Sequence, residues 1–100
     1  MIELEDAVME IIVNAGQSRS LCFEALHAAR TGNIDEARLL LNEADGYARR
    51  AHQMQTQLIE QDVGEARQPM TLIMVHAQDH LMNSLLAREF SEELIHLYQR

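Results

Sequence analysis

The sequence predicts an all-α protein, a three-helix antiparallel bundle formed by a single domain of residues 1–100. Two breaks containing glycine, asparagine or proline divide the chain into three long segments, and each segment repeats apolar or small side chains at steps of three and four residues. Aromatic residues make up only 4% of the chain, so leucine, isoleucine, methionine and alanine must fill the interior, a composition that favours helices. We expect helices at roughly residues 3–30, 34–61 and 70–99.

The first expected helix carries one apolar stripe, which consists of Leu4, Val8, Ile11, Ala15, Cys22, Ala25 and Ala29. Cys22 is the only cysteine, so neither an intrachain disulfide nor a cysteine-based zinc site can form, and we expect it to be a small buried hydrophobe. Gly16 interrupts this helix at a cost of up to about 1 kcal/mol relative to alanine. Close helix packing is the preferred explanation, and a shallow depression where a partner approaches a neighbouring side chain is the other.

The first break is Thr31-Gly32-Asn33. Gly32 is expected to close the first helix in the left-handed conformation, and Asn33 is expected to cap the second, with Glu36 completing a capping box. The second helix then shows a regular seam, with Gln55 completing the register of Ile34, Ala37, Leu41, Ala44, Ala48, Ala51 and Leu58.

The second break runs from about residue 62 to residue 70 and contains Gly64 and the only proline, Pro69. It is polar enough to be a mobile loop.

The third expected helix places a carboxylate within an apolar stripe. Asp79 lies on one line with Leu72, Leu86, Phe90 and Leu97, which Val75 and Met82 widen on one side and Asn83 and His76 on the other. Burying a lone carboxylate costs several kcal/mol, so Asp79 needs an arginine from another helix, an exposed position or a metal ion. The residues leave a buried salt bridge and a shared metal equally open.

This helix is apolar on more than one side, because Leu81, Leu85 and Ile95 lie almost opposite Asp79. One face can therefore pack on the chain's own helices and another on neighbouring subunits of a symmetric oligomer.

His76 and His80 are one helical turn apart and have three possible roles. They could share a transition metal, although Ala77 stands where the usual helical zinc signature has glutamate. They could be structural, which the residues alone favour and which is also expected for the other histidines, His27, His52 and His96. They could also transfer a phosphoryl group, with one imidazole as nucleophile and the neighbouring histidine or Gln78 as hydrogen-bond donor.

Composition excludes several functions. A formal net charge of −8 argues against nucleic-acid binding. All eight basic residues are arginine, and neither a Walker lysine nor a glycine-rich phosphate loop is present, so no nucleotide cofactor is expected and a phosphoryl donor would be another protein. The first residues are acidic, and no apolar run approaches the roughly 18 residues that span a bilayer, so we expect a cytoplasmic protein.

The segment VHAQDHLM at residues 75–82 resembles the active-site motif of the lactose/cellobiose class of IIA proteins of the bacterial sugar phosphotransferase system. The resemblance extends to NAGQSRSLCFEAL, AHQMQTQLIEQDVGEA and LAREFSEELIHLY, and so covers essentially the whole chain. Within this class, QTQLIE and VHAQDHLM are more similar to the chitobiose/cellobiose branch than to the lactose branch.

The resemblance implies a phosphotransferase component that works as a homotrimer, a nine-helix bundle. His76 would accept a phosphoryl group from the phosphocarrier HPr and pass it to a cysteine of the IIB component. IIB would phosphorylate a β-linked disaccharide that enters through the membrane component IIC, with chitobiose or cellobiose favoured over lactose. Asp79 would face the trimer axis and share a divalent cation, expected to be Mg²⁺, with its two symmetry mates, while Gln78 and His80 would flank His76. A non-catalytic helical interaction module with a metal on His76 and His80 is the alternative.

Overall fold

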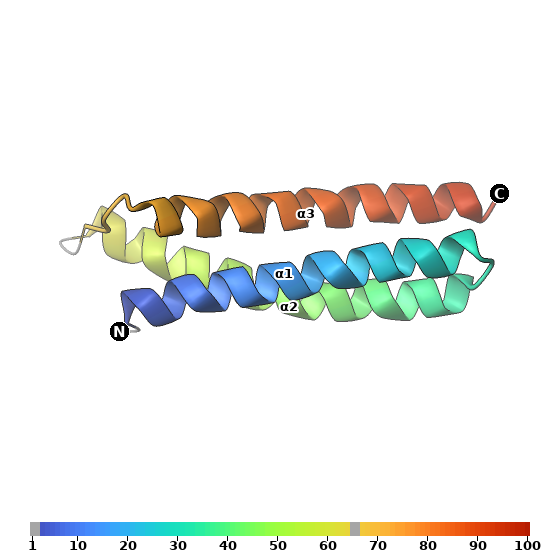
Figure 1. The fold of residues 1–100 in the computed structure, drawn as a ribbon, viewed down its shortest axis with the longest axis horizontal. Coiled ribbons are helices and arrows are strands. Elements are labelled where there is room, and N and C mark those ends of the chain that lie inside the picture. The colour runs from blue at the N-terminus through green and yellow to red at the C-terminus, as the bar shows by residue number, and fades with distance from the viewer. Residues whose placement is uncertain (1–2, 65–66) are drawn as a thin grey trace.

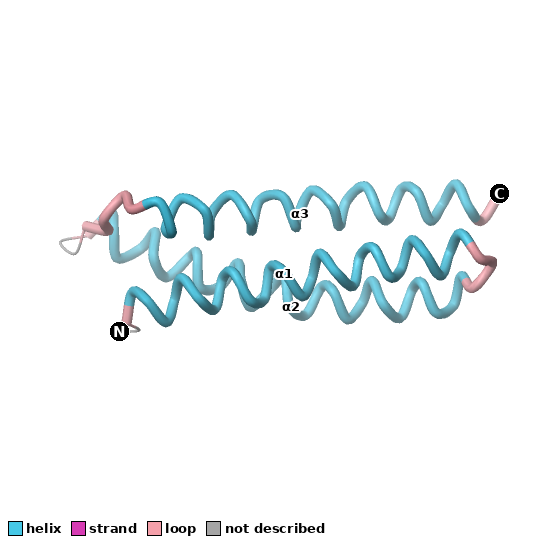
Figure 2. The backbone as a smooth tube through the Cα atoms, viewed as in Figure 1, coloured by secondary structure: helices cyan, strands magenta, loops and turns pink. Residues whose placement is uncertain are grey.

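The computed structural model describes residues 3–64 and 67–100 and consists of three long helices. Helix α1 spans Leu4–Arg30, α2 spans Ile34–Val63 and α3 spans Leu72–Tyr98, and no strand is found in these residues. The helices lie side by side in a rod of 52 × 18 × 18 Å, with α1 and α3 pointing the same way and α2 running back between their ends (Figure 1). The two connections lie at opposite ends of the rod (Figure 2). The all-α three-helix prediction is confirmed.

The turn between α1 and α2 is closed by a Schellman motif. Gly32 has a φ of 92°, its N–H donates to the carbonyl of Ala29 at 3.1 Å, and the N–H of Asn33 donates to the carbonyl of Ala28 at 2.8 Å. The expected left-handed glycine is therefore confirmed. The expected capping box is wrong, because Asn33 has a ψ of 70° rather than the extended value of a helix cap, and its side chain makes no capping hydrogen bond.

The end of α2 and the start of α3 both differ from the prediction by two residues. Asp62 and Val63, expected in the break, form the last turn of α2. The Asp62 carboxylate then accepts a hydrogen bond from the backbone N–H of Gln68 at 2.8 Å. Helix α3 begins after Thr71, whose hydroxyl accepts the N–H of Met74 at 3.3 Å as an N-cap that the sequence analysis missed. Part of the predicted mobile loop, residues 65–66, lies outside the described residues.

The core consists of two clusters along the rod. The first, at the end where α3 begins, contains Ala7, Val8, Ile11, Ala15, Ala51, Leu58, Met74, Ala77 and Leu81. The second, at the other end, contains Leu21, Cys22, Ala25, Ala29, Ala37, Leu41, Ala44 and Ile95. The stripes expected on the first two helices therefore face the interior, and their many alanines let the helix backbones approach closely.

Helix α3 turns the face opposite Asp79 toward the other two helices. Its buried residues are Met74, Ala77, Leu81, Ser84, Ser91 and Ile95. The stripe around Asp79 lies on the outside of the chain, where Leu72 is 87% exposed and Phe90 is 61% exposed. Within the described residues, no helix is long and apolar enough to span a membrane.

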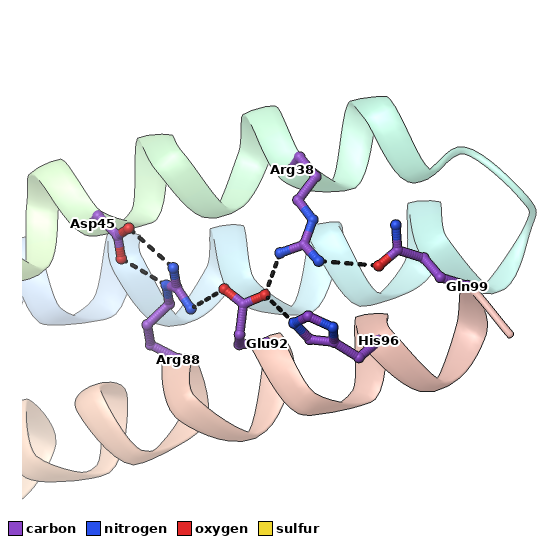
Figure 3. Close-up of polar contacts among 6 residues, drawn as sticks. All are labelled: Arg38, Asp45, Arg88, Glu92, His96 and Gln99. Carbon is purple, nitrogen blue, oxygen red and sulfur yellow. Dashed lines mark hydrogen bonds and ion pairs between the residues drawn. The ribbon is translucent and has the colours of Figure 1, made fainter.

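A polar network joins α2 to the second half of α3 (Figure 3); its members are Arg38, Asp45, Arg88, Glu92, His96 and Gln99. Arg88 donates two hydrogen bonds to Asp45, at 2.6 and 3.1 Å, and a third to Glu92 at 3.2 Å. Glu92 also accepts from Arg38 and lies 2.9 Å from His96. The hydrogen bond from Arg38 is the main reason why the pKa of the Glu92 carboxyl is lowered.

Replacing Glu92 with glutamine should lower the free energy of unfolding by about 1 kcal/mol at pH 7, since several partners share this half-buried carboxylate. Because the pKa of Glu92 is lowered in the folded state, its stabilising effect is present above the pKa of the unfolded chain. That effect is lost as the pH falls through the lowered value. Urea denaturation at pH 7 and at pH 3 measures this difference.

The matched control is Glu93→Gln, which removes an exposed carboxylate outside the network. Equal losses of stability in the two variants at pH 7 would show that the network does not hold α3 to α2.

Candidate functional site

The two histidines of α3 lie one turn apart with their rings almost parallel. The ring centroids of His76 and His80 are 5.8 Å apart, and the angle between the ring planes is 13°. His76 is exposed and His80 is half-buried. An exposed imidazole is accessible for nucleophilic attack, and the second ring is a polar neighbour.

The half-buried ring of His80 packs against α1 at Gly16. A Cβ atom added to Gly16 would lie 3.2 Å from Nε2 of His80, closer than an ordinary van der Waals contact. The glycine therefore marks a close approach between α1 and α3, which is the explanation that the sequence favours. The structure adds that the side chain facing Gly16 is the ring of His80, which the spacing of residues in the sequence does not reveal.

Gln78 is directed to another side of α3. Its carbonyl oxygen accepts a hydrogen bond from Nε2 of Gln55 on α2 at 2.8 Å, and its own amide nitrogen lies 3.5 Å from the sulfur of Met74. Residues two positions apart are separated by about 200° around a helix, so Gln78 and His76 point in nearly opposite directions. Within one chain, the structure does not bring Gln78 beside His76, where the sequence analysis placed it.

Gln55 is the partner of Gln78, a pairing that the sequence analysis did not predict. The available signal was its position, because this polar amide occupies a place in the otherwise apolar register of α2. A half-buried polar side chain needs a hydrogen-bond partner, and the amide of Gln78 is that partner.

Asp79 lies on the exposed face of α3. Its Oδ1 accepts a hydrogen bond from the amide of Asn83 at 3.3 Å, and its apolar neighbours Val75 and Met82 are 45% and 46% exposed. No arginine forms an ion pair with it among the described residues. The suggested salt bridge to an arginine of α1 or α2 is therefore not formed within the chain.

A single chain does not provide a metal centre of three or more ligands. Residues 3–64 and 67–100 contain no group of three histidine, cysteine, aspartate or glutamate side chains placed to hold an ion. A carboxylate oxygen suits a hard divalent cation, but Asp79 alone supplies one residue. A shared cation therefore depends on several chains meeting at Asp79.

The thiol of the single cysteine, Cys22, is inaccessible as a nucleophile. Cys22 is fully buried in the second core cluster, and burial raises the pKa of its thiol. A buried thiol with a raised pKa is a poor nucleophile. Of the two imidazoles in the motif at residues 75–82, that of His76 is the more exposed.

The hydrogen bond between Gln55 and Gln78 should appear as coupling in the free energy of unfolding. We expect Gln55→Leu and Gln78→Leu each to destabilise the protein, because each leaves the other amide without its partner. The double variant should lose about 0.5–1 kcal/mol less than the sum of the single losses. Urea denaturation of the four proteins measures the coupling, and strictly additive losses would show that the bond is not formed in solution.

Comparison with known proteins supports the resemblance seen in the motif. Residues 6–99 match the family described as the lactose/cellobiose-specific IIA subunit of the phosphotransferase system. The N,N'-diacetylchitobiose-specific EIIA component of Escherichia coli K12 is 46% identical over 98 residues, which are 98% of this chain and 84% of that protein. The lichenan-specific enzyme IIA component of Bacillus subtilis is 42% identical, over 98% of this chain and 89% of that protein.

Solved structures agree with the fold. The cellobiose-specific enzyme IIA of Bacillus anthracis superposes with a TM-score of 0.93 at 34% identity, over 99% of this chain and 92% of that one. The IIA(chitobiose) chain of E. coli, solved in complex with HPr, has a TM-score of 0.85 at 44% identity, over 99% and 96% of the two chains. This chain therefore belongs to the lactose/cellobiose-specific IIA family and is a component of a sugar phosphotransferase system.

Proposed function

We propose that this chain carries a phosphoryl group on His76, receives it from HPr and passes it to a cysteine of a IIB component. The observation that supports this proposal best is the exposed imidazole of His76, stacked on a second imidazole within the motif at residues 75–82. The E. coli relative solved with HPr supports the choice of donor. In this proposal the chain works in the cytoplasm and meets the membrane only through a IIC component.

The transfer balances without ATP or a redox partner. The N–P bond of the phosphohistidine of HPr breaks as a nitrogen of His76 forms a new N–P bond. The ring of His76 releases the proton from its other nitrogen, and the departing imidazole of HPr takes up one proton. In the second step the IIB thiolate forms an S–P bond, the N–P bond of His76 breaks, and the His76 ring regains a proton.

A carrier must hold the phosphoryl group without stabilising it too strongly. An arginine clamp would form strong charge-assisted hydrogen bonds and slow the release of the group. Two of the arginines, Arg38 and Arg88, are engaged in the polar network between α2 and the second half of α3, away from the motif. The ring beside His76 is the imidazole of His80, a weaker partner suited to transient binding.

The sugar is proposed from the relatives alone, because a IIA chain passes on the phosphoryl group rather than binding the sugar. The relatives quoted above are specific for chitobiose, lichenan and cellobiose. We propose a β-linked disaccharide, with chitobiose or cellobiose ahead of lactose.

We also propose that three chains assemble through the exposed stripe of α3. Leu72, Leu86, Phe90 and Leu97 are between 51% and 87% exposed, and contiguous apolar side chains of this kind mark an interaction surface. Asp79 lies in this stripe, so three chains meeting there would bring three carboxylates together. A divalent cation, for which Mg²⁺ is the first choice, would offset their repulsion.

Phosphorylation by phospho-HPr tests the carrier proposal. The wild-type protein should take up one acid-labile phosphoryl group per chain, and His76→Gln should take up none, because the glutamine amide is not a nucleophile. Intact-protein mass spectrometry at neutral pH measures the label. His52→Gln is the matched control, since His52 is an exposed histidine of α2, and it should be labelled like the wild type. Full labelling of His76→Gln would refute the assignment.

Replacing Asp79 with leucine tests the assembly proposal. We expect Asp79→Leu to preserve the trimer and to stabilise it by about 1 kcal/mol or more, because an apolar group replaces a charge that must otherwise be neutralised. Light scattering measures the oligomeric state, and metal analysis should find one cation per three wild-type chains and none in the variant. Leu86→Glu, which puts a charge into the stripe, should give monomers. Monomeric Asp79→Leu would show instead that assembly requires the cation.

A further inference from the structure

We propose that Gly16 is a positioning residue for phosphoryl transfer, because its missing Cβ leaves the space in which the ring of His80 lies beside His76. The inference rests on the carrier function proposed above. It gives a residue of α1 a role in a reaction whose nucleophile lies on α3.

The backbone of Gly16 does not require glycine. Among the described residues only Gly32 has a positive φ, so Gly16 has an ordinary helical conformation that alanine would adopt readily. Alanine is also the stronger helix former, so glycine here weakens α1. The backbone conformation therefore gives no reason for glycine at position 16, and the reason must be sought in its surroundings.

A spatial requirement is visible at the side chain of His80. An added Cβ would stand 3.2 Å from Nε2 of His80, whereas a Cβ added to Gly46, inside α2, would meet nothing within 4 Å. At Gly64, which follows α2, the nearest atoms belong to the backbone of the last turn of α2. Of the chain's glycines, Gly16 is thus the one whose Cβ would push on a side chain from another helix.

The ring of His80 is the part that would move. The atom in contact is the far end of a side chain with two rotatable bonds, so the ring can shift while both helix backbones stay in place. The ring is half-buried against α1 and nearly parallel to His76, with the centroids 5.8 Å apart. A shift away from Gly16 would therefore change the position of the His80 ring relative to His76.

The position of the His80 ring matters because hydrogen bonds to a transferring phosphoryl group depend steeply on distance and angle. A displacement of about 1 Å at a reacting centre can cost up to about a hundredfold in rate. A smaller displacement, of the few tenths of an ångström that the contact demands, should have an effect of about tenfold.

The test compares Gly16→Ala with Gly46→Ala in single-turnover transfer from phospho-HPr. We expect both variants to fold with the wild-type helix content and oligomeric state. The maximal transfer rate should fall about tenfold in Gly16→Ala at an unchanged half-saturating concentration of phospho-HPr, and Gly46→Ala should match the wild type. A wild-type rate in Gly16→Ala would overturn the proposal. A weaker apparent affinity with an unchanged maximal rate would also overturn it, since Gly16 would then serve the docking of the donor.

A double-variant cycle shows whether the effect passes through His80. In the His80→Ala background the added methyl group has no ring to displace, so Gly16→Ala should cause no further loss. An equal loss in both backgrounds would overturn the proposal, because the methyl group would then act on something other than the ring.

An NMR measurement separates this inference from the carrier proposal. The ring protons of His80 should change their chemical shifts and their contacts with α1 in Gly16→Ala, and those of His52 should not. If the wild-type protein accepts no phosphoryl group on His76, the carrier proposal fails and the transfer role of Gly16 fails with it. The NMR result then still reports whether Gly16 holds the ring, and unchanged His80 resonances would overturn the proposal at its geometric step.

Discussion

The rotation of α3 about its own axis is the constraint on which the other features of the chain depend. Ala77 and Leu81 are fully buried in the same cluster as Ala15 of α1, and the small alanine side chains allow the two helices to approach closely. Once these residues face inward, the directions of their neighbours follow from the helical period. His76 and Asp79 face outward, and Gln78 faces α2. One set of packing contacts thus places the nucleophile and the carboxylate on the outward face and the amide on the side toward α2.

Polar contacts between α2 and α3 also hold that rotation. Near the histidines, the amide of Gln55 binds the amide of Gln78. In the second half of α3, Arg88 and Glu92 join the helix to α2 through the network of Figure 3. Such bonds depend on distance and angle, whereas apolar burial does not depend on direction. They therefore define how α3 is turned, in addition to stabilising its contact with α2.

The outward face of α3 carries two features that differ in chemistry. Its apolar residues are exposed in the single chain, and contiguous apolar side chains of this kind mark an interaction surface. In the proposed carrier function the histidine pair needs access instead, because it would meet a donor and an acceptor in turn. Membership of the lactose/cellobiose-specific IIA family makes this chain a component of a sugar phosphotransferase system. The proposed trimer would use the stripe and leave the imidazole of His76 accessible.

The linear pattern is sufficient to predict the three helices, the left-handed Gly32, the buried Cys22 and the motif that identifies the family. These features depend on local conformation and on periodicity, which a linear pattern contains. The tertiary structure decided the contact of Gly16 with His80, the bond between Gln55 and Gln78 and the outward position of Asp79. Periodicity shows which residues share a face of a helix, but the face that meets another helix depends on how all three helices pack together. For this reason the contacts of His80 and Gln78 with the other helices follow only from the packed bundle.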